Sequence, residues 1–411
     1  MSQKPFFERV YVREPEEGLR GETLYFEVTN SGAILAFGAK IHEARWPGGI
    51  DHGFPWLHVR ARSIDQGKTW IEEERNYWEP ETRGQWASVV DRSTGEIFMF
   101  NQGTWPLPDD KGEPVSESWM IANFEKGREL GAKMIMERSR DGGKSWAKVD
   151  ITDQFFTYPG AGLAWFIGAG IQLQRGAHAG RLVVPGRYFA KEIEEVDPEK
   201  HNILHQHESL GPIYDDGDGQ IAPVLDDKAH NAVAYSDDHG ETWQWGGSSQ
   251  GFSGEACIVE LSDGSVYMSN RNHNPKSLGY RSWCISRDGG ETFTEFGVNE
   301  ALIESRCHAS LARYIDPAGN QPDRILFSNP AVFEGKWQSP SRGCGKLCRI
   351  NQTVRMSYDD GKTWPVSRRV DEEGSYSSLV VLADGTILCG FGRKVLRFNM
   401  AWLEQGDSEP N

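Results

Sequence analysis

The sequence predicts an all-β fold, a six-bladed β-propeller, and three observations lead to this prediction. An eight-residue pattern, S-x-D-x-G-x-[ST]-[WF], occurs five times, at 63–70, 139–146, 236–243, 286–293 and 357–364. Six short apolar runs follow Gly or Asp turns, and both ends of the chain contain a further strand-like segment. Self-similarity of this kind is the sequence signature of a repeat architecture.

The eight-residue pattern describes a tight turn between two antiparallel strands. Its Ser and Asp side chains can bond back to nearby backbone amides, and its Gly supplies the positive φ that the turn needs. The final aromatic side chain is then expected to fold under the turn and pack. We interpret all five copies as parts of the scaffold.

The six apolar runs are rich in Ile, Leu, Val, Phe and Tyr and have about the length of a strand. This composition is typical of inner strands that are buried on both faces. One such strand in each blade gives six blades. The runs lie at 31–38, 94–101, 179–186, 263–270, 323–330 and 384–391.

The two ends of the chain are predicted to close the ring. Residues 393–400 form one strand after the last inner strand, and residues 7–13 are the natural candidate to complete that sheet. Closing the ring with strands from both termini protects edges that would otherwise stay open. Because the repeats extend along the chain, we predict a single domain over residues 1–411.

The five turns resemble Asp boxes, also called BNR repeats, and five of them on about six blades are similar to the sialidase (neuraminidase) superfamily. The resemblance covers nearly the whole chain, and it implies a six-bladed propeller and a glycoside hydrolase of exo-sialidase type. Fold alone does not determine function, because Asp-box propellers also occur in proteins that only bind. The residues of the site must therefore decide between an enzyme and a binding protein.

The composition argues against several classes of partner. A formal net charge of −16 disfavours nucleic acid and anionic membranes, and no apolar run approaches the ~20 residues of a membrane span. The N-terminal residues lack the features of a secretory signal, which predicts a cytoplasmic protein unless a signal has been removed. The molecule as a whole would repel an acidic sugar, so binding one requires a local cluster of arginines.

Three arginines are candidates for this cluster. Arg349, in R-x-N-x-T-V-R-x-S before the last Asp box, resembles the superfamily's third carboxylate-binding arginine, and Arg271 resembles the second. The family spacing for the first arginine reaches Glu22 instead, and the nearest arginine is Arg20. An offset of two residues keeps a side chain on one face of a strand, so Arg20 either reaches the pocket across a bulge or is a solvated surface residue.

Three further residues match catalytic positions of the family. Glu255 opens the segment GEACIVELSDG in the place of the base, and Tyr376, just before the last inner strand, takes the place of the nucleophile. Asp51, eleven residues before Arg62, takes the place of the acid/base. By itself, a loop Asp is usually exposed and a Tyr before a strand usually packs. The presence of Glu255 and two matching arginines favours the catalytic interpretation of Tyr376.

The resemblance also implies a substrate and a reaction. The arginines would hold the carboxylate of a terminal α-ketosidic acidic sugar, a sialic acid or a related ulosonic acid such as Kdn or Kdo. A neutral phenol attacks beside that carboxylate more easily than a second carboxylate would. We therefore predict a retaining exo-glycosidase in which Glu255 accepts the proton of Tyr376 and Asp51 protonates the leaving oxygen. The alternatives are a glycosidase or lyase acting on a different glycan and a non-catalytic glycan-binding propeller.

No metal or other cofactor is expected. Cys344 and Cys348 could form half of a metal site, but no second pair lies nearby, and the acidic run 214–218 lacks the spaced oxygens of a calcium loop. Long inserts at 102–130 and 186–230 are expected to form rims or partner contacts that shape substrate choice. Trp165 and Phe166 either stack on a sugar or are buried, and burial is the simpler expectation.

Overall fold

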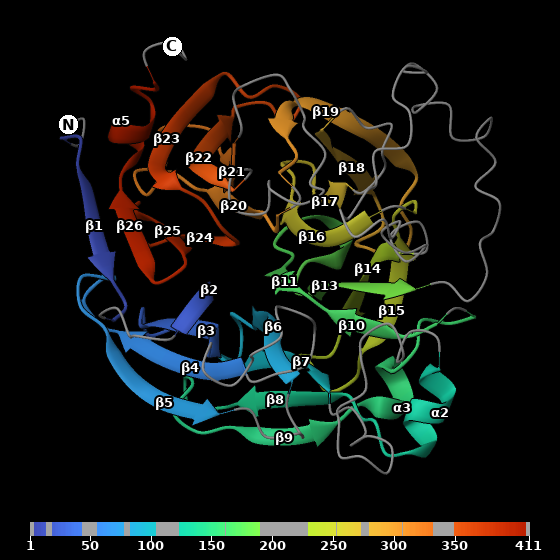
Figure 1. Cartoon of the computed structure of the whole chain (residues 1–411). Helices are drawn as coiled ribbons and strands as arrows, with labels where there is room; N and C mark the ends of the chain where they lie inside the picture. Colours follow the sequence, from blue (N-terminus) through green and yellow to red (C-terminus); the bar gives the residue numbers. More distant parts are fainter. Residues whose placement is uncertain are drawn as a thin grey trace, which may run out of the picture.

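Six β-sheets are arranged around a common axis as the blades of a propeller (Figure 1). The structure is a computed structural model that describes residues 4–13, 19–42, 56–77, 83–103, 123–160, 162–189, 229–251, 253–272, 279–305, 307–331 and 349–407. Paired strands are antiparallel in these residues, except that the short strand β11 (Gly168–Ala169) runs parallel to β6 (Arg83–Val90). The predicted six-bladed β-propeller is confirmed.

Five blades follow one another along the chain, and each begins near the axis and ends at the rim. The first contains β2 (Leu19–Val28), β3 (Ile34–His42), β4 (Trp56–Ser63) and β5 (Ile71–Tyr77). The second contains β6, β7 (Ile97–Gly103), β8 (Ile135–Ser139) and β9 (Ala147–Asp150), with β11 beside β6. The third contains β10 (Ala164–Phe166), β12 (Ile171–Gln172), β13 (Leu182–Phe189), β14 (Ala229–Ser236) and β15 (Gln244–Ser248).

The remaining three blades repeat this order. The fourth contains β16 (Ser253–Glu260), β17 (Val266–Asn272), β18 (Tyr280–Ser286) and β19 (Glu295–Ile303). The fifth contains β20 (Ser310–Tyr314), β21 (Arg324–Pro330), β22 (Ile350–Ser357) and β23 (Val366–Glu373). The sixth contains β24 (Ser377–Val381), β25 (Ile387–Phe391), β26 (Lys394–Phe398) and, from the N-terminus, β1 (Phe7–Tyr11).

The six predicted apolar runs overlap β3, β7, β13, β17, β21 and β25, so each of them does contain a strand. Each is an inner strand of its blade, as predicted, and lies directly outside an axial strand: β2, β6, β10, β16, β20 or β24. Both positions are covered on two faces by neighbouring blades. The innermost strands carry buried polar residues, such as Glu27, Ser88 and Glu255, which lower their apolar content and hide them from a search for apolar runs.

Each Asp box joins the last two strands of its blade. In all five boxes, the Ser side chain accepts a hydrogen bond from the amide of the Gly, and the Asp side chain accepts one from the amide of the Thr or Ser. In the first, Ser63 Oγ accepts from the Gly67 amide and Asp65 Oδ1 from the Thr69 amide, both at 2.9 Å. The indole of Trp70 donates to the Gly67 carbonyl at 3.1 Å, which holds the ring under the turn. Gly67 has a φ of 80°. The predicted turn chemistry is confirmed.

The aromatic residues of two Asp boxes connect neighbouring blades. Trp146 of the second blade contacts Phe37 of the first with ring centroids 6.2 Å apart, and Trp243 of the third contacts Phe98 of the second at 5.6 Å. These contacts extend the buried apolar layers that fill the space between the sheets. The Asp boxes thus fasten the blades together at one face of the ring.

Strands from both termini complete the sixth blade, as predicted. β1 pairs with β26, with Phe7 opposite Phe398, and β1 and α5 (Met400–Leu403) lie at the same edge of the ring (Figure 1). Arg397 forms an ion pair with Glu8 across this pairing. The edge of β26 is therefore not left open.

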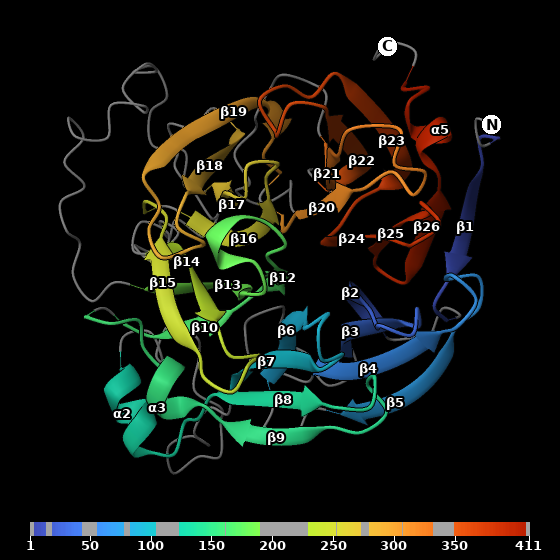
Figure 2. The ribbon, with the colours of Figure 1, turned by 180° about the vertical axis from the view of Figure 1, so that it is seen from behind.

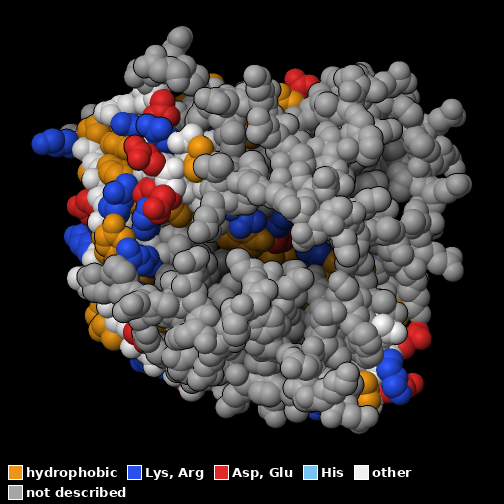
Figure 3. Space-filling view, viewed as in Figure 1, with side chains coloured by type: hydrophobic (Ala, Val, Ile, Leu, Met, Phe, Trp, Pro, Cys, Tyr) orange, Lys and Arg blue, Asp and Glu red, His pale blue; other side chains and the backbone are white. Residues whose placement is uncertain are grey.

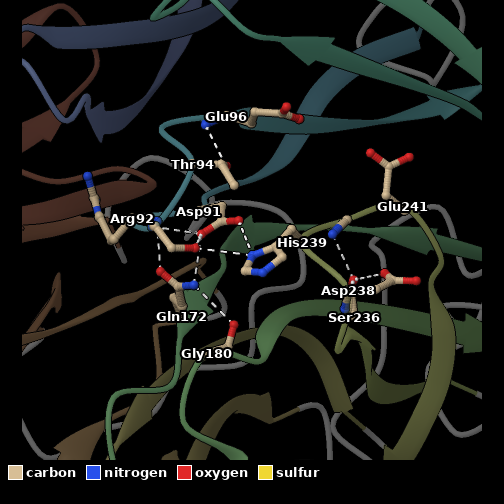
Figure 4. A network of polar contacts seen from close by, with 12 residues as sticks. Asp91, Arg92, Thr94, Glu96, Gln172, Gly180, Ser236, Asp238, His239 and Glu241 are labelled. Carbon is tan, nitrogen blue, oxygen red and sulfur yellow. Dashed lines mark hydrogen bonds and ion pairs between the residues drawn. The ribbon is translucent and has the colours of Figure 1, made fainter.

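A polar network joins the second and third blades near the Asp-box face (Figure 4). The buried carboxylate of Asp91 accepts from the Ser93 amide at 2.8 Å and from Gln172 Nε2 at 2.9 Å. Its other oxygen lies 2.8 Å from Nδ1 of His239, a residue of the third Asp box. Gln172 also donates to the Gly180 carbonyl at 3.0 Å. The network joins residues from both blades to one buried charge.

The described helices are short. α2 (Phe124–Glu129) and α3 (Thr152–Phe155) lie outside the ring beside the second and third blades, and both views show them there (Figures 1 and 2). A 3-10 turn, η2 (Gly176–His178), precedes β13, and α5 (Met400–Leu403) lies against β23. No helix among the described residues is long and apolar enough to cross a membrane.

Candidate active site

Four predicted site residues gather at the end of the axis opposite the Asp boxes. β16, β22 and β24 begin at this end and β17 finishes there, so residues at these strand ends converge from the fourth, fifth and sixth blades. Figure 3 shows a hollow near the middle of this face, with basic, acidic and apolar side chains inside it. The four residues are Glu255, Arg271, Arg349 and Tyr376.

A bulge in β16 places Glu255. The pairing of β16 with β17 shifts in register between Ser253 and Ala256, which gives β16 one extra residue and re-aims its side chains. Glu255 Oε2 accepts a hydrogen bond from Arg271 Nη1 at 2.7 Å, and only 6% of Glu255 is exposed. A buried carboxylate needs such a partner, because an unpaired buried charge is costly.

Tyr376, directly before β24, brings a phenol to the same pair from the sixth blade. Its hydroxyl donates to Glu255 Oε1 and accepts a hydrogen bond from Arg271 Nη1 at 3.0 Å. One oxygen of the carboxylate therefore faces the phenol, and the other faces the guanidinium. A nucleophile within reach of a base, with the base oriented by a third group, is the arrangement expected for covalent catalysis.

Arg349, directly before β22, lies over the ring of Tyr376, with its guanidinium carbon 5.1 Å from the ring centroid. Arg271 and Arg349 thus bring two positive charges to one phenol. In a chain with a net charge of −16, these residues form a local positive region on the axis. Guanidinium groups bind carboxylates through paired, charge-assisted hydrogen bonds.

Burial and charge set the ionisation of the cluster. Burial acts to raise the pKa of Glu255, but the charge of Arg271 and the hydrogen bonds outweigh it and lower the pKa to about 2. Burial and then the charge of Glu255 raise the pKa of Tyr376 above its usual value of 10. Burial would lower the pKa of Arg271, but Glu255 raises it overall. Near neutral pH, the cluster holds a carboxylate, a neutral phenol and a guanidinium.

Two residues that the sequence analysis missed complete the floor of the site. The ring of His308, which lies between β19 and β20, is centred 5.8 Å from that of Tyr376. On the other side of His308, the ring of Tyr25 from β2 lies 5.7 Å away. Neither residue has a local sequence signal, because an aromatic residue in a buried strand and a single His in a connection are both ordinary. Only the meeting of blades at the axis reveals them.

Two predicted site residues are not placed. Arg20 lies in β2, and the register of β2 with β3 shifts between Arg20 and Thr23, so the bulge that the sequence analysis considered is present. The side chain of Arg20 and the whole of Asp51 lie outside the described residues. Their roles stay predictions.

Other sequence predictions have mixed outcomes. Trp165 and Phe166 are buried in the apolar layer of the second and third blades, so the packing interpretation is confirmed. Cys344, Cys348, the acidic run 214–218 and most of the inserts 102–130 and 186–230 lie outside the described residues. The four described cysteines are buried free thiols, as expected for small apolar residues: Cys257, Cys284, Cys307 and Cys389.

Comparison with known proteins identifies the family. The model of the BNR repeat-like domain matches residues 44–389. The chain belongs to the BNR repeat-like family. A sialidase of Micromonospora viridifaciens is 31% identical to this chain over an aligned length of 406 residues, and the alignment covers 92% of the chain and 51% of that protein. An anhydrosialidase of Macrobdella decora is 26% identical over 62% of the chain and 28% of its own length.

The solved structures agree on the fold. A Hadza microbial sialidase superposes with a TM-score of 0.62 at 21% identity, covering 95% of this BNR repeat-like chain and 68% of that chain. The family match and the similarity to the Micromonospora sialidase confirm the resemblance to the sialidase superfamily that the sequence predicts. The chain spans about half the length of the Micromonospora sialidase and less of the Macrobdella anhydrosialidase, so both relatives contain further sequence.

Proposed function

We propose that the protein is a retaining exo-glycosidase of sialidase type that releases a terminal α-ketosidic acidic sugar. The preferred substrate class is a sialic acid, with the related ulosonic acids Kdn and Kdo as further candidates. The observation that carries the proposal is the hydrogen-bonded group in which the Tyr376 hydroxyl and Arg271 share the buried carboxylate of Glu255. The similarity to sialidases supports it.

Recognition of the sugar carboxylate is proposed for Arg271 and Arg349. Their guanidinium groups flank the phenol that would attack the anomeric carbon, which is the carbon that bears this carboxylate. The Nε of Arg271 is buried and has no hydrogen-bond partner among the described residues. A buried donor of this kind suits a ligand that brings acceptor oxygens. Arg20 is proposed as a third contact.

In the first chemical step, the Tyr376 oxygen forms a bond to the anomeric carbon while the bond to the leaving oxygen breaks. Glu255 takes the phenol proton, and Asp51 is proposed to give a proton to the leaving oxygen. A phenol is a poor nucleophile while it keeps its proton, so withdrawal of the proton by a hydrogen-bonded base is needed. The product of this step is a glycosyl–tyrosine intermediate.

Substrate binding is expected to strengthen the base. In the free protein, Arg271 donates to Glu255 and lowers its pKa to about 2, which makes this carboxylate a weak base. A substrate carboxylate that takes up part of the Arg271 charge would raise the basicity of Glu255. The base would then be activated only when the sugar is bound.

In the second step, water replaces Tyr376 at the anomeric carbon. Asp51 accepts the proton of the water and Glu255 returns its proton to the phenol, which restores both groups. Two displacements give net retention of configuration. Because a relative is named an anhydrosialidase, attack by a hydroxyl of the sugar itself is the alternative second step, and it would yield an anhydro sugar.

The test compares the parent protein with Tyr376→Phe on a fluorogenic α-sialoside. We expect release by the parent and a loss of about a thousandfold or more in kcat for the variant, because residues that act as one catalytic unit are individually essential. Tyr358→Phe is the matched control, since Tyr358 lies in the last Asp box and is 44% exposed. Nuclear magnetic resonance of the products separates free from anhydro sugar and reports retention.

The outcomes separate the candidate functions. If the parent releases nothing from α-linked sialic acid, Kdn and Kdo glycosides between about pH 4 and 8, the glycosidase proposal fails. Calorimetric binding of the free sugars that survives Tyr376→Phe would then support a glycan-binding propeller. Release of Kdn or Kdo alone would keep the mechanism and change the substrate.

A further inference from the structure

Three rings from three blades lie in a row of contacts at the propeller axis. Tyr25 comes from the first blade, His308 from the connection into the fifth, and Tyr376 from the start of the sixth. The imidazole lies in the middle, tilted by 47° to the phenol of Tyr376 and by 63° to the ring of Tyr25. His308 is 2% exposed and Tyr25 is 6% exposed. The floor beneath the reacting phenol is therefore made of two polar rings.

The imidazole is held in place from behind. Gly168 of β11 has a φ of 105°, and a Cβ at this position would lie 3.2 Å from Cε1 of His308, so the ring packs directly against backbone. The buried pair of Arg281 and Glu304 fixes the preceding residue, because Arg281 donates to the Cys307 carbonyl at 3.1 Å and Glu304 accepts from the Cys307 amide at 3.3 Å. His308 has little room to withdraw from Tyr376.

Two polar atoms of this floor have no hydrogen-bond partner among the described residues. They are the hydroxyl of Tyr25 and the Nδ1 of His308, and both atoms are buried. A hydroxyl can donate, and an unprotonated imidazole nitrogen can accept. Buried waters typically bridge such groups, because an unsatisfied buried polar atom is costly. The two side chains are neighbours and chemically complementary.

We propose that Tyr25 and His308 are positioning residues, joined through one buried water, that hold the phenol of Tyr376 against Glu255. The inference deepens the proposed function and rests on it. The water would donate to Nδ1, which puts the imidazole proton on Nε2. With its ring held from below, Tyr376 keeps its hydroxyl on Glu255 Oε1 while Arg271 turns toward the substrate.

A neutral imidazole suits this position. Burial lowers the pKa of His308 to about 4, although the charge of Glu255 acts to raise it, and the charges of Arg281 and Arg271 lower it further. A protonated His308 would stabilise Glu255 as a carboxylate and so weaken it as a base. The group that positions the phenol therefore adds no charge near neutral pH.

The first test measures steady-state kinetics on the fluorogenic α-sialoside for three variants: Tyr25→Phe, His308→Phe and the double variant. Tyr25→Phe removes only the hydroxyl. We expect kcat to fall about tenfold in each, with KM within about twofold, because a small misplacement of a reacting group has this effect. The double variant should lose no more than the worse single one, since the residues act as one unit. Tyr314→Phe, a buried tyrosine at the other end of β20, is the control.

The second test does not depend on turnover. Nitrogen resonances of labelled histidine, with His308 assigned by its loss in His308→Phe, should show an unprotonated Nδ1 that stays neutral from about pH 8 to 5 and shifts in Tyr25→Phe. A tenfold kinetic loss together with this shift supports the inference. Normal kcat in Tyr25→Phe, additive losses or an unchanged resonance would overturn it. A parent without turnover but with the shift would instead overturn the proposed function and leave the Tyr25–His308 pairing supported.

Discussion

Two buried carboxylates, Asp91 and Glu255, lie at opposite ends of the propeller, and their surroundings differ in kind. Asp91 is fully buried near the Asp boxes and has hydrogen-bond partners on both oxygens, from Ser93, Gln172 and His239 (Figure 4). These partners come from the turns and strands of two adjoining blades. Both oxygens of the carboxylate are thus hydrogen-bonded within the scaffold, and the network serves to hold two blades together.

Glu255 also has partners on both oxygens, but the groups around it are incompletely satisfied. The Nε of Arg271, the hydroxyl of Tyr25 and the Nδ1 of His308 are buried without a hydrogen-bond partner among the described residues. Folded proteins leave few such atoms, so several in one cluster indicate a place where a ligand or water completes the structure. Between these two networks, the difference therefore lies in how completely the polar groups are hydrogen-bonded and not in the burial of charge.

A third buried carboxylate, Glu27, extends the comparison. It lies in β2 and accepts a hydrogen bond from Ser88 at 2.8 Å. Burial raises its pKa to about 7, although Arg92 and Ser88 act to lower it. Glu255, with an arginine and a phenol in direct contact, has a pKa of about 2 under the same degree of burial. The number and charge of the donors thus decide which buried carboxylates stay ionised.

Removing the charge of Glu255 should have the largest effect. We expect Glu255→Gln to lower kcat by about 10²- to 10⁴-fold, the usual contribution of a general base, because an amide cannot accept the phenol proton. Initial rates on the fluorogenic α-sialoside measure this. Asp91→Asn makes the same chemical change in the other network and should leave kcat within about twofold. A Glu255→Gln variant with kcat within tenfold of the parent would remove Glu255 from the mechanism.

Removing the charge of Glu27 should stabilise the protein at alkaline pH. Its folded pKa, about 7, lies above the ordinary 4.5, so its contribution to stability is fully present below about pH 4.5 and is lost as the pH rises through 7. Glu27→Gln mimics the neutral acid. At pH 8, its free energy of unfolding should exceed that of the parent by up to about 3 kcal/mol, at ~1.36 kcal/mol for each pKa unit. Urea unfolding at both pH values measures the gain.

Glu300→Gln, at an exposed glutamate of β19, is the control for this experiment and should leave the free energy of unfolding unchanged within about 0.5 kcal/mol at either pH. An equal effect of Glu27→Gln at pH 4.5 and pH 8 would show that Glu27 does not titrate in this range. Glu27 would then no longer count as a buried carboxylate that is kept neutral by its surroundings.

Replacing Arg349 by Lys keeps the positive charge over Tyr376 but removes the planar group that can bind a carboxylate through two bonds. We expect kcat/KM to fall about 10- to 100-fold, the range for a lost hydrogen bond to a charged group. Steady-state kinetics measure the change. Arg369→Lys, on the exposed outer strand β23, should have no effect. Unchanged kcat/KM in Arg349→Lys would mean that Arg349 does not contact the substrate.

The fold could be predicted because its signals are local. The hydrogen bonds of an Asp box lie within eight residues, as from Ser63 to Trp70, so the sequence pattern and the turn correspond directly. The order of strands within a blade is not local. Apolar runs predict inner strands such as β3, but they do not reveal the axial strand β2, which carries the polar Glu27.

The site could be predicted only in part, because its members come from separate blades. Resemblance to a family supplied Glu255, Arg271, Arg349 and Tyr376, and the structure brings these four together. Tyr25 and His308 have no motif, and their relation to Tyr376 arises only when the ring closes. In physical terms, local bonding is encoded within a repeat, whereas convergence on the axis is a property of the closed ring.

The smallest expected effect is on the Asp91 network, where Asp91→Asn should lower the free energy of unfolding by about 1 to 2 kcal/mol at pH 7, because buried donors lose a charged acceptor. Burial acts to raise the pKa of Asp91, but the bonds from Ser93 and then His239 outweigh it and hold it well below 3.8. The contribution of Asp91 is therefore present above about pH 4 and is lost as the pH falls below it. Urea unfolding should give a difference in the free energy of unfolding between parent and variant that becomes smaller at pH 3. The exposed control Asp153→Asn should unfold with the same free energy as the parent. A matching loss of kcat in Asp91→Asn would contradict the division between scaffold and site, since a network that serves only to hold two blades together has no route to the phenol of Tyr376.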